Sequence, residues 1–330
     1  MKGICDMPET QRKRRSKFTK AILPQKYTRS KKVIEILKVL HPDAYSMLTT
    51  QQIYQLCFKK GSKAYCDEIL RHMYHRPLQL VNRHAFTFTK GLNNASLFYT
   101  ISRKGSQLLY EKNLGRVITP QKAYKMKNSK NLYREHEKGL NDVRIAIVKG
   151  AEKIGAVIET WISDSDFKKP KIRKQLRVQD QKTGEIFGFE PDGFFVLRLP
   201  TGERKPFFLE YDNNTTFHKR FQRIKIQGYH LLGDIWRKLP VFVKYKDIQV
   251  TYRVLTVTNA GVDRAFHFKQ QSVEALFVKD NKRELHTRRF YFTQADLVVN
   301  DTIFTEPIWF IPFKSKTQNQ KFAIFESKLV

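Results

Sequence analysis

The sequence is poor in cysteine and has no long apolar run. Its three cysteines, Cys5, Cys57 and Cys66, form no CxxC pair and have no zinc-binding spacing, so we expect buried free thiols and no disulfide framework. No apolar segment reaches the roughly 20 residues that cross a bilayer. The N-terminus also lacks the apolar stretch of a signal peptide. We therefore expect a cytoplasmic protein without membrane insertion.

Acidic residues are also scarce, and this is the strongest signal in the composition. Asp and Glu number 31 against 62 Lys and Arg, which gives a formal net charge of +31. The excess runs along the whole chain. It predicts a polyanionic partner, with nucleic acid as the first candidate and an anionic membrane surface as the second. We rank the membrane lower because no long amphipathic helix with a basic face is evident.

The first part of the chain predicts a small DNA-binding domain behind a basic tail. Residues 1–26 contain the run QRKRRSK and are typical of a disordered tail, which either contacts phosphates or only aids solubility. Residues 27–112 show three short helical segments, the third capped by Ser62, then two strand-like segments around the polar tip Gly91–Asn94 and a helix from Ser102. This order is that of a winged helix-turn-helix, whose third helix enters the major groove.

Basic side chains of the third helix and of the hairpin are candidates for DNA contact. They are Lys63, Arg71, Arg83 and Lys90. Acidic residues on the same helix count against tight DNA binding there. A module that makes only structural contacts therefore stays open as an alternative.

Residues 113–130 are interpreted as a linker, and residues 131–330 as a second domain. The second domain begins with a long amphipathic helix that has His136 on its apolar stripe and Glu137 on the adjacent one. The segments expected after it are, in order, a strand at 156–163, a basic irregular stretch at 166–177, a hairpin at 189–214, a helix at 215–239 and strands at 248–259, 274–279 and 289–299. Helices packed against several strands predict an α/β (α+β) sheet domain.

The hairpin FEPDGFFVLRLPTGERKPFFLEYDNN places three carboxylates among apolar side chains. Because side chains alternate along a strand, Glu210 and Asp212 point to the same face, and pairing across the Thr201-Gly202 turn brings Asp192 to the same end of the sheet. Protonation or a bound divalent cation relieves the repulsion among them. Carboxylates with open water positions suit Mg²⁺ or Mn²⁺, so Asp192, Glu210 and Asp212 are the predicted metal ligands.

The helix after the hairpin adds positive charge. Lys225 and Tyr229 share one helical stripe, and Lys225 lies at the edge of the buried face, within reach of the carboxylates. A cation-activated water, a nearby ammonium and a positive groove are what phosphodiester hydrolysis needs. Lys219 and Arg223 on the same helix are further candidates for DNA contact. The alternative is a surface in which Glu210 and Asp212 only form salt bridges with nearby basic residues.

Pro191-Asp192, the hairpin and the pair Glu210 and Asp212 resemble the motif of the PD-(D/E)XK nucleases. The pattern departs at Asp212, which stands where that family has its lysine. In several branches the lysine lies on the following helix with a tyrosine four residues later, which is the spacing of Lys225 and Tyr229. A glutamate on the first helix also recurs in this superfamily, and Glu137 holds that place.

A wider pattern resembles the plasmid replication-relaxation family and the MobC-type relaxases. It comprises a winged helix, HExxLNDVRIAI from His136, the hairpin acids with the lysine and tyrosine, and FTQADL…EPIW at 292–309, and it spans roughly residues 30–312. The resemblance implies a PD-(D/E)XK restriction-endonuclease-like second domain that cuts or nicks DNA at a plasmid or mobile-element origin of transfer or replication. The candidate catalytic residues are Asp192, Glu210, Asp212, Lys225, Tyr229, Glu137 and His136.

The implied partners are double-stranded, supercoiled origin DNA and other relaxosome or transfer proteins. We expect hydrolysis by a metal-activated water, with Tyr229 in an orienting role. A tyrosine nucleophile is less favoured because the nine histidines form no His-hydrophobic-His motif. Two other functions stay open. One is a non-catalytic origin-binding regulator with a degenerate nuclease fold, which the acid at position 212 favours, and the other is a restriction-type endonuclease.

Overall fold

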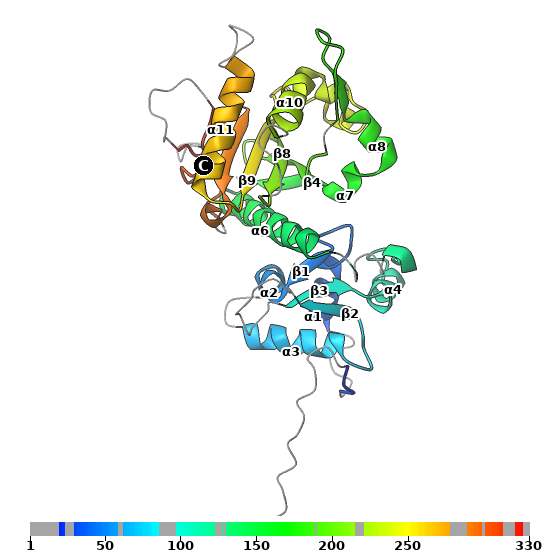
Figure 1. Ribbon diagram of the computed structural model, residues 1–330. Coiled ribbons are helices and arrows are strands. Elements are labelled where there is room, and N and C mark those ends of the chain that lie inside the picture. The colour runs from blue at the N-terminus through cyan, green and yellow to red at the C-terminus, as the bar shows by residue number, and fades with distance from the viewer. Residues whose placement is uncertain are drawn as a thin grey trace, which may run out of the picture. The chain divides into compact units, whose positions relative to one another are not determined.

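A computed structural model describes residues 20–23, 30–58, 62–85, 97–122, 128, 130–188, 190–214, 221–277, 289–298, 301–312 and 321–325. Most of the expected basic tail and the hairpin tip at Gly91–Asn94 lie outside these ranges. The chain divides into two compact units, Met1–Asn131 and Leu132–Val330, which are described separately (Figure 1). Within the described ranges, none of the helices has the length and apolar character needed to span a bilayer.

The first unit combines helices with a small antiparallel sheet. Its elements are α1 (Lys31–Val39), β1 (Met47–Thr49), α2 (Thr50–Cys57), α3 (Lys63–Tyr74), β2 (Val81–Ala85), β3 (Leu97–Ile101) and α4 (Arg103–Glu111). The strand order is β1-β3-β2, and both pairings are antiparallel. Leu37, Ile69 and Ile101 are fully buried in the core between these helices and the sheet.

Side-chain caps fix where several helices of this unit begin. Thr49 and Gln52 form a capping box at the start of α2, and the Ser102 hydroxyl accepts the Gly105 N–H at the start of α4. Each cap satisfies a backbone N–H that has no partner within its helix. Ser62 holds the N-cap position of α3, as predicted, but its side chain makes no cap hydrogen bond.

The cysteines described by the structure are free thiols, as predicted. Cys57 at the end of α2 and Cys66 on α3 are both buried and unpaired by disulfide. Burial raises the pKa of each thiol to about 12. Both are therefore inert apolar members of the core of the first unit.

The second unit is built on a five-stranded mixed sheet. Its elements are α6 (Asn131–Lys153), β4 (Val157–Ser163), α7 (Asp164–Phe167), α8 (Pro170–Gln175), β5 (Arg177–Gln179), β6 (Ile186–Gly188), β7 (Gly193–Arg198), β8 (Arg204–Asp212), the π-helix η1 (Phe221–Ile226), α10 (Gln227–Leu232), the 3-10 helices η2 (Gly233–Lys238) and η3 (Val243–Tyr245), β9 (Arg253–Thr258), α11 (Val262–Phe277), β10 (Phe290–Gln294) and the 3-10 helix η4 (Ala295–Leu297). The strand order is β10-β9-β8-β7-β4, and β5 pairs with β6 in a separate ribbon. β7 is antiparallel to β4 and β8, whereas β8, β9 and β10 are parallel. The expectation of a mixed α/β fold is confirmed.

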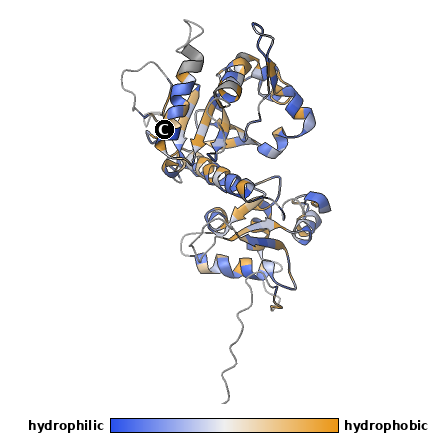
Figure 2. Cartoon of the chain, viewed as in Figure 1, coloured by the Kyte–Doolittle hydropathy of each residue, from blue (hydrophilic) through white to orange (hydrophobic). Residues whose placement is uncertain are grey.

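Both faces of this sheet are buried. On one face, Phe195 packs with Leu140 of α6, and on the other, Phe194 and Phe208 pack with Tyr229 of α10. Because alternate residues of β7 and β8 enter opposite cores, both strands are nearly continuous apolar runs. Figure 2 shows hydrophobic residues on the strands of this sheet. The acidic hairpin is therefore covered by helices on both sides.

Two local expectations for the second unit are wrong, and a third is right only in part. Segment 274–279 was expected as a strand, but α11 continues as far as Phe277, because its apolar residues also fit the helical period. The stretch expected to be irregular, 166–177, contains the end of α7 and the whole of α8, and Pro170 opens α8 in the first turn, where proline suits a helix. The helix expected over 215–239 consists, from 221 onward, of η1, α10 and η2, and α10 ends at Gly233, whose φ is +35°.

Gly139 on α6 allows the close approach of Tyr211 on β8. A Cβ at position 139 would lie 2.0 Å from the ring Cζ and the hydroxyl oxygen of Tyr211. Overpacking costs about 1–3 kcal/mol, against a helix-propensity gain of about 1 kcal/mol for alanine. We therefore expect Gly139→Ala to lower the free energy of unfolding by up to about 2 kcal/mol in chemical denaturation.

Gly188→Ala is the matched control. A Cβ there would lie 3.7 Å from its nearest neighbour, Arg177 Cγ, which is an ordinary van der Waals distance. Its free energy of unfolding should stay close to that of the wild type. Equal stability of the two alanine variants would contradict the packing of Tyr211 against α6.

Candidate functional site

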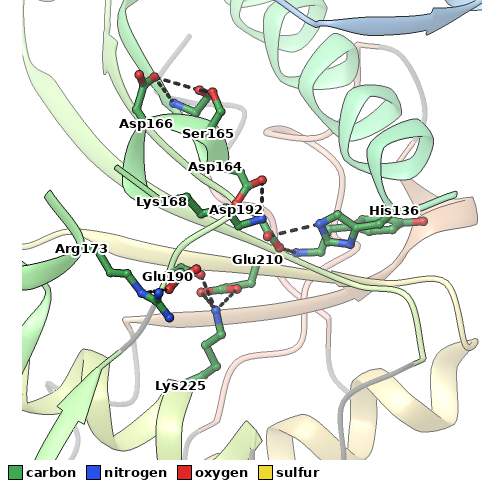
Figure 3. Close-up of polar contacts among 12 residues, drawn as sticks. His136, Asp164, Ser165, Asp166, Lys168, Arg173, Glu190, Asp192, Glu210 and Lys225 are labelled. Atoms are coloured by element: carbon green, nitrogen blue, oxygen red, sulfur yellow. Dashed lines mark hydrogen bonds and ion pairs between the residues drawn. The ribbon is translucent and has the colours of Figure 1, made fainter. Parts of the chain in front are cut away.

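Glu210 on β8 is the centre of a buried polar cluster (Figure 3). The residue is 5% exposed. Lys225 Nζ donates to Oε1 at 2.9 Å and to Oε2 at 2.7 Å, and the Tyr229 hydroxyl donates to Oε1 at 2.6 Å. Burial raises the pKa of Glu210 to about 7, even though the Lys225 ammonium acts in the opposite direction. A proton on Glu210 is thus exchangeable near neutral pH.

The position of Lys225 follows from the π-helix η1. Phe221 of η1 and Tyr229 of α10 are buried in the core against β8, which brings the intervening Lys225 to the carboxylate. Its ammonium also donates to the backbone carbonyl of Glu190 at 2.7 Å. These three hydrogen bonds match the three protons of an ammonium group. Short π-helical segments recur at functional sites.

Asp192 lies just before β7 and completes the acidic pair. Its Oδ2 accepts the backbone N–H of Tyr211 at 2.7 Å, and its Oδ1 lies 3.3 Å from His136 Nε2. Burial opposes ionisation, but the hydrogen bond and charge of His136, together with Lys225, lower the pKa of Asp192 overall. Burial likewise opposes protonation of His136, yet Asp192 raises the pKa of His136. The contact therefore favours the charged forms of both side chains.

Tyr211 points away from the acids toward α6, as the strand alternation predicts. Its ring centroid lies 5.6 Å from that of His136 in an edge-on arrangement. This contact holds His136 beside Asp192. The phenol of Tyr211 thus lies on the opposite face of β8 from Lys225 and Tyr229.

Two further carboxylates extend the cluster along α6 and α7. Glu137 is 8% exposed and Asp164 is 7% exposed. Burial raises the pKa of both, to about 7 for Glu137, where the charge of Asp164 adds to the rise. Lys168 Nζ lies 2.8 Å from the Asp164 carboxylate and compensates its charge. The sequence interpretation had missed Asp164 and Lys168; the signal was an acid directly after an apolar strand with a lysine four residues later.

The structure does not bring Asp212 into this cluster. Arg264 of α11 binds it with both ends of its guanidinium, Nε at 2.9 Å and Nη2 at 3.3 Å, and the Thr258 hydroxyl donates to it at 2.9 Å. A two-pronged guanidinium contact of this kind satisfies a buried carboxylate. Asp212 therefore serves to fix α11 on the sheet, and Arg264 was not predicted because it lies 52 residues away.

The residues expected to contact DNA have different surroundings. Lys63 and Arg71 are exposed on α3. The Arg83 guanidinium lies 4.1 Å over the Tyr74 ring, so packing fixes its orientation. The remaining candidates are outside what the structure describes, namely Lys90, Lys219 and the side chain of Arg223.

The donor chemistry of Asp192 and Glu210 suits a divalent cation. Mg²⁺ binds one or two protein carboxylates and keeps several waters. A carboxylate has about four lone-pair positions, of which the hydrogen bonds above use two at Asp192 and three at Glu210. Open positions therefore remain on both. Among the residues described, no group of three or more His, Cys, Asp or Glu side chains is arranged to hold a metal, so water would supply the other ligands.

These features define a two-unit α/β protein with a buried carboxylate, lysine and tyrosine cluster on a mixed sheet. Comparison with known protein families matches residues 37–239, more than half of the chain, to the replication-relaxation family. The chain therefore belongs to the replication-relaxation family. Membership suggests a role in plasmid replication or mobilisation and an involvement of DNA. Searches among curated proteins and among solved structures found no match.

Glu137 should make the stability of the protein depend on pH. Its pKa is about 7 in the folded state, against an ordinary value of 4.5. The folded state holds this proton more tightly than the unfolded state does. Protonated Glu137 therefore contributes fully to the free energy of unfolding below about pH 4.5, and this contribution is lost as the pH rises through about 7. Glu137→Gln cannot ionise. We expect it to be more stable than the wild type by roughly 3 kcal/mol at pH 8 and by only about 1 kcal/mol at pH 5, since one pKa unit is worth about 1.4 kcal/mol.

Urea unfolding of both proteins between pH 5 and pH 8 measures this difference. Glu152→Gln, at an exposed position of the same helix, is the control, and its stability should follow the wild type throughout. Parallel stability curves for Glu137→Gln and the wild type would show that Glu137 titrates as an exposed carboxylate.

Proposed function

We propose that the protein is a metal-dependent DNA endonuclease or nickase that acts at a plasmid or mobile-element origin. The observation that carries the proposal is the contact of Lys225 with both oxygens of Glu210, in the same cluster as Asp192. These are the two acids and the lysine of the PD-(D/E)XK motif, with the lysine supplied by the helix after the hairpin. The acid at position 212 does not interrupt this set, because Arg264 binds it.

The arrangement of elements supports the same reading. In the second unit, α6 precedes the antiparallel strands β4, β7 and β8, and η1 and α10 then lead to the parallel strand β9. This is a mixed sheet of the kind that the nuclease resemblance implies. In the first unit, three helices precede the β2–β3 hairpin, which supports a winged helix-turn-helix with α3 as the recognition helix.

Each residue of the cluster has a role in hydrolysis under this proposal. A divalent cation bound by Asp192 and Glu210 would activate a water and neutralise phosphate charge. Lys225 stabilises the negative charge that develops on the phosphate. His136 keeps Asp192 ionised and oriented, and Tyr229 fixes the orientation of Glu210 through its hydrogen bond. Glu137 lies in the same cluster and can hold or release a proton near neutral pH.

Burial of Tyr229 favours water over tyrosine as the nucleophile. Tyr229 has no exposed surface, and its hydroxyl proton is donated to Glu210. Burial raises its pKa well above the usual range, and the nearby charge of Glu210 adds to the rise. A phenolate at this position is therefore strongly disfavoured. Tyr229 acts here as a positioning residue.

A non-catalytic origin-binding regulator with the same fold is the second candidate. The observation that favours it is that Lys225 alone already compensates Glu210, with all three ammonium protons used within the protein. A restriction-type endonuclease would share the chemistry and differ in cutting both strands. Cleavage of plasmid DNA separates the regulator from the two enzymes.

The carboxylate pair should be essential for cleavage of supercoiled plasmid that carries the origin of the protein's own element. We expect Mg²⁺ or Mn²⁺ to support nicking and EDTA to abolish it. Asp192→Asn and Glu210→Gln should each lower the rate by more than about 100-fold, because each removes a charge that acts in the transition state. DNA affinity, measured without divalent cations, should change little.

Asp212→Asn is the matched control. Asp212 lies on the same face of β8 as Glu210, but its partner is Arg264. We expect it to retain nicking, with folding of all variants checked by thermal unfolding. A wild-type nicking rate in Asp192→Asn would show that Asp192 is not a catalytic residue. Loss of nicking in folded Asp212→Asn would show that Asp212 is one.

Lys225 should contribute to rate far more than to DNA affinity. Lys225→Met should lower the nicking rate by at least about 100-fold with a much smaller effect on affinity, because its charge matters most as phosphate charge develops. Lys168→Met removes another lysine of the cluster, paired with Asp164, and should keep most of the rate. A wild-type nicking rate in Lys225→Met would show that Lys225 only pairs with Glu210 and takes no part in cleavage. No nicking by any variant or by the wild type would favour the regulator.

A further inference from the structure

A strongly basic segment of the second unit leads up to the carboxylate cluster. Residues 168–177 contain six Lys or Arg and no acidic residue. Three of these basic residues pair with acids outside the segment. The other three, Lys171, Lys174 and Arg177, are exposed, and within the described part of the chain they have no ion-pair partner. Their charge is available to an external anion.

The segment is anchored to the core of the second unit. Phe167 before it and Leu176 within it have no exposed surface, and Val178 of β5 and Phe187 of β6 are also buried in the same core. Gln175 Oε1 accepts the backbone N–H of Val241 at 2.9 Å. The basic side chains of α8 and β5 therefore project from a fixed surface, where a bound chain would find them in constant positions.

A pocket of about 410 Å³ is lined by residues of α8, of β5 and β6, and of the approach to β7. The lining residues are Arg173, Arg177, Ile186, Gly188 and Glu190. Guanidinium groups present paired N–H donors that match phosphate oxygens. Ile186 is 60% exposed and offers an aliphatic surface for a sugar or a base.

Glu190 connects this pocket with the carboxylate cluster (Figure 3). Its carboxylate forms an ion pair with Arg173, and its carbonyl oxygen accepts Lys225 Nζ at 2.7 Å. The pocket wall and the Lys225 and Glu210 pair are thus linked through a single residue. The buried acids would repel a phosphodiester backbone, so an approaching strand needs fixed cations beside them.

We propose that the pocket between α8 and the β5–β6 hairpin is a backbone-phosphate site for a DNA strand. Arg177 in the pocket wall binds the strand, together with the exposed Lys171 and Lys174 of α8 beside the pocket. They hold the strand against the Lys225 and Glu210 pair. That the bound strand leads to the Lys225 and Glu210 pair rests on the proposed function. Binding of DNA in the pocket does not depend on cleavage. DNA is favoured over an anionic membrane because Ile186 is the only exposed large apolar side chain among the described residues from 168 to 190.

The test compares two double variants of the full chain in EDTA, using fluorescence anisotropy with a labelled DNA oligonucleotide at several salt concentrations. Lys174→Ala/Arg177→Ala removes one charge from the pocket wall, at Arg177, and one from the exposed surface of α8. The control, Lys149→Ala/Lys153→Ala, removes two charges from α6, on the other face of the sheet. We expect the first variant to bind at least about 10-fold more weakly at 150 mM salt and to lower the slope of log K against log salt by about 2.

The control should change both quantities little. If both double variants lost DNA affinity equally, the loss would be an effect of net charge alone, and the proposal would be overturned. Acetylation of the wild type, followed by mass spectrometry, gives a second measurement. DNA should protect Lys171 and Lys174 from acetylation and leave Lys149 and Lys153 reactive, and unprotected Lys171 and Lys174 would contradict the site.

Vesicles that contain phosphatidylserine test the competing partner. Loss of vesicle binding in Lys174→Ala/Arg177→Ala, with DNA binding unchanged, would assign the surface to a membrane and overturn the proposal. Failure of the wild type to nick plasmid, together with the expected DNA-binding results, would reject nuclease activity and still support the phosphate site. The two proposals therefore fail separately.

Discussion

The compensation of buried Glu210 by Lys225 and Tyr229 is the constraint on which the second unit depends. A carboxylate taken out of water is strongly destabilising unless charged or polar partners replace the lost hydration. Those partners come from η1 and α10, so these elements must lie on the same face of β8 as Glu210. The apolar contacts of Phe208 and Phe221 hold them there. The local fold and the site geometry are thus consequences of the same pairing.

Asp192 and Glu210 belong to one cluster, but their pKa values move in opposite directions. Asp192 is ionised through His136 and a backbone N–H, whereas burial raises the pKa of Glu210 to about 7. Environments that separate the pKa values of two neighbouring acids are typical of sites that move protons. At neutral pH, one acid of the pair keeps its charge, and the other can gain or lose a proton. A cation or a phosphate that approaches would therefore change the protonation of Glu210 first.

Sequence reasoning could place the features that follow from local periodicity. Alternation along β8 set Glu210 and Tyr211 on opposite faces, and helical spacing put Lys225 and Tyr229 on one stripe. Local spacing also marks Asp164, an acid directly after an apolar strand with Lys168 four residues later, but its burial comes from tertiary packing and could not be predicted. The end of α11 was misjudged for a related reason, since a short apolar run fits a strand and a helix equally well. Contacts across long separations in the chain, such as that of Arg264, leave no periodic signal.

The pairing of Asp212 with Arg264 explains how a second buried acid can stand on the same face of β8 as Glu210. Two acids on one face of β8 need two cations, and the structure supplies them as the pairs of Glu210 with Lys225 and of Asp212 with Arg264. The family match ends at residue 239, before Arg264. The part of the chain beyond that match therefore neutralises Asp212, which leaves Lys225 to Glu210.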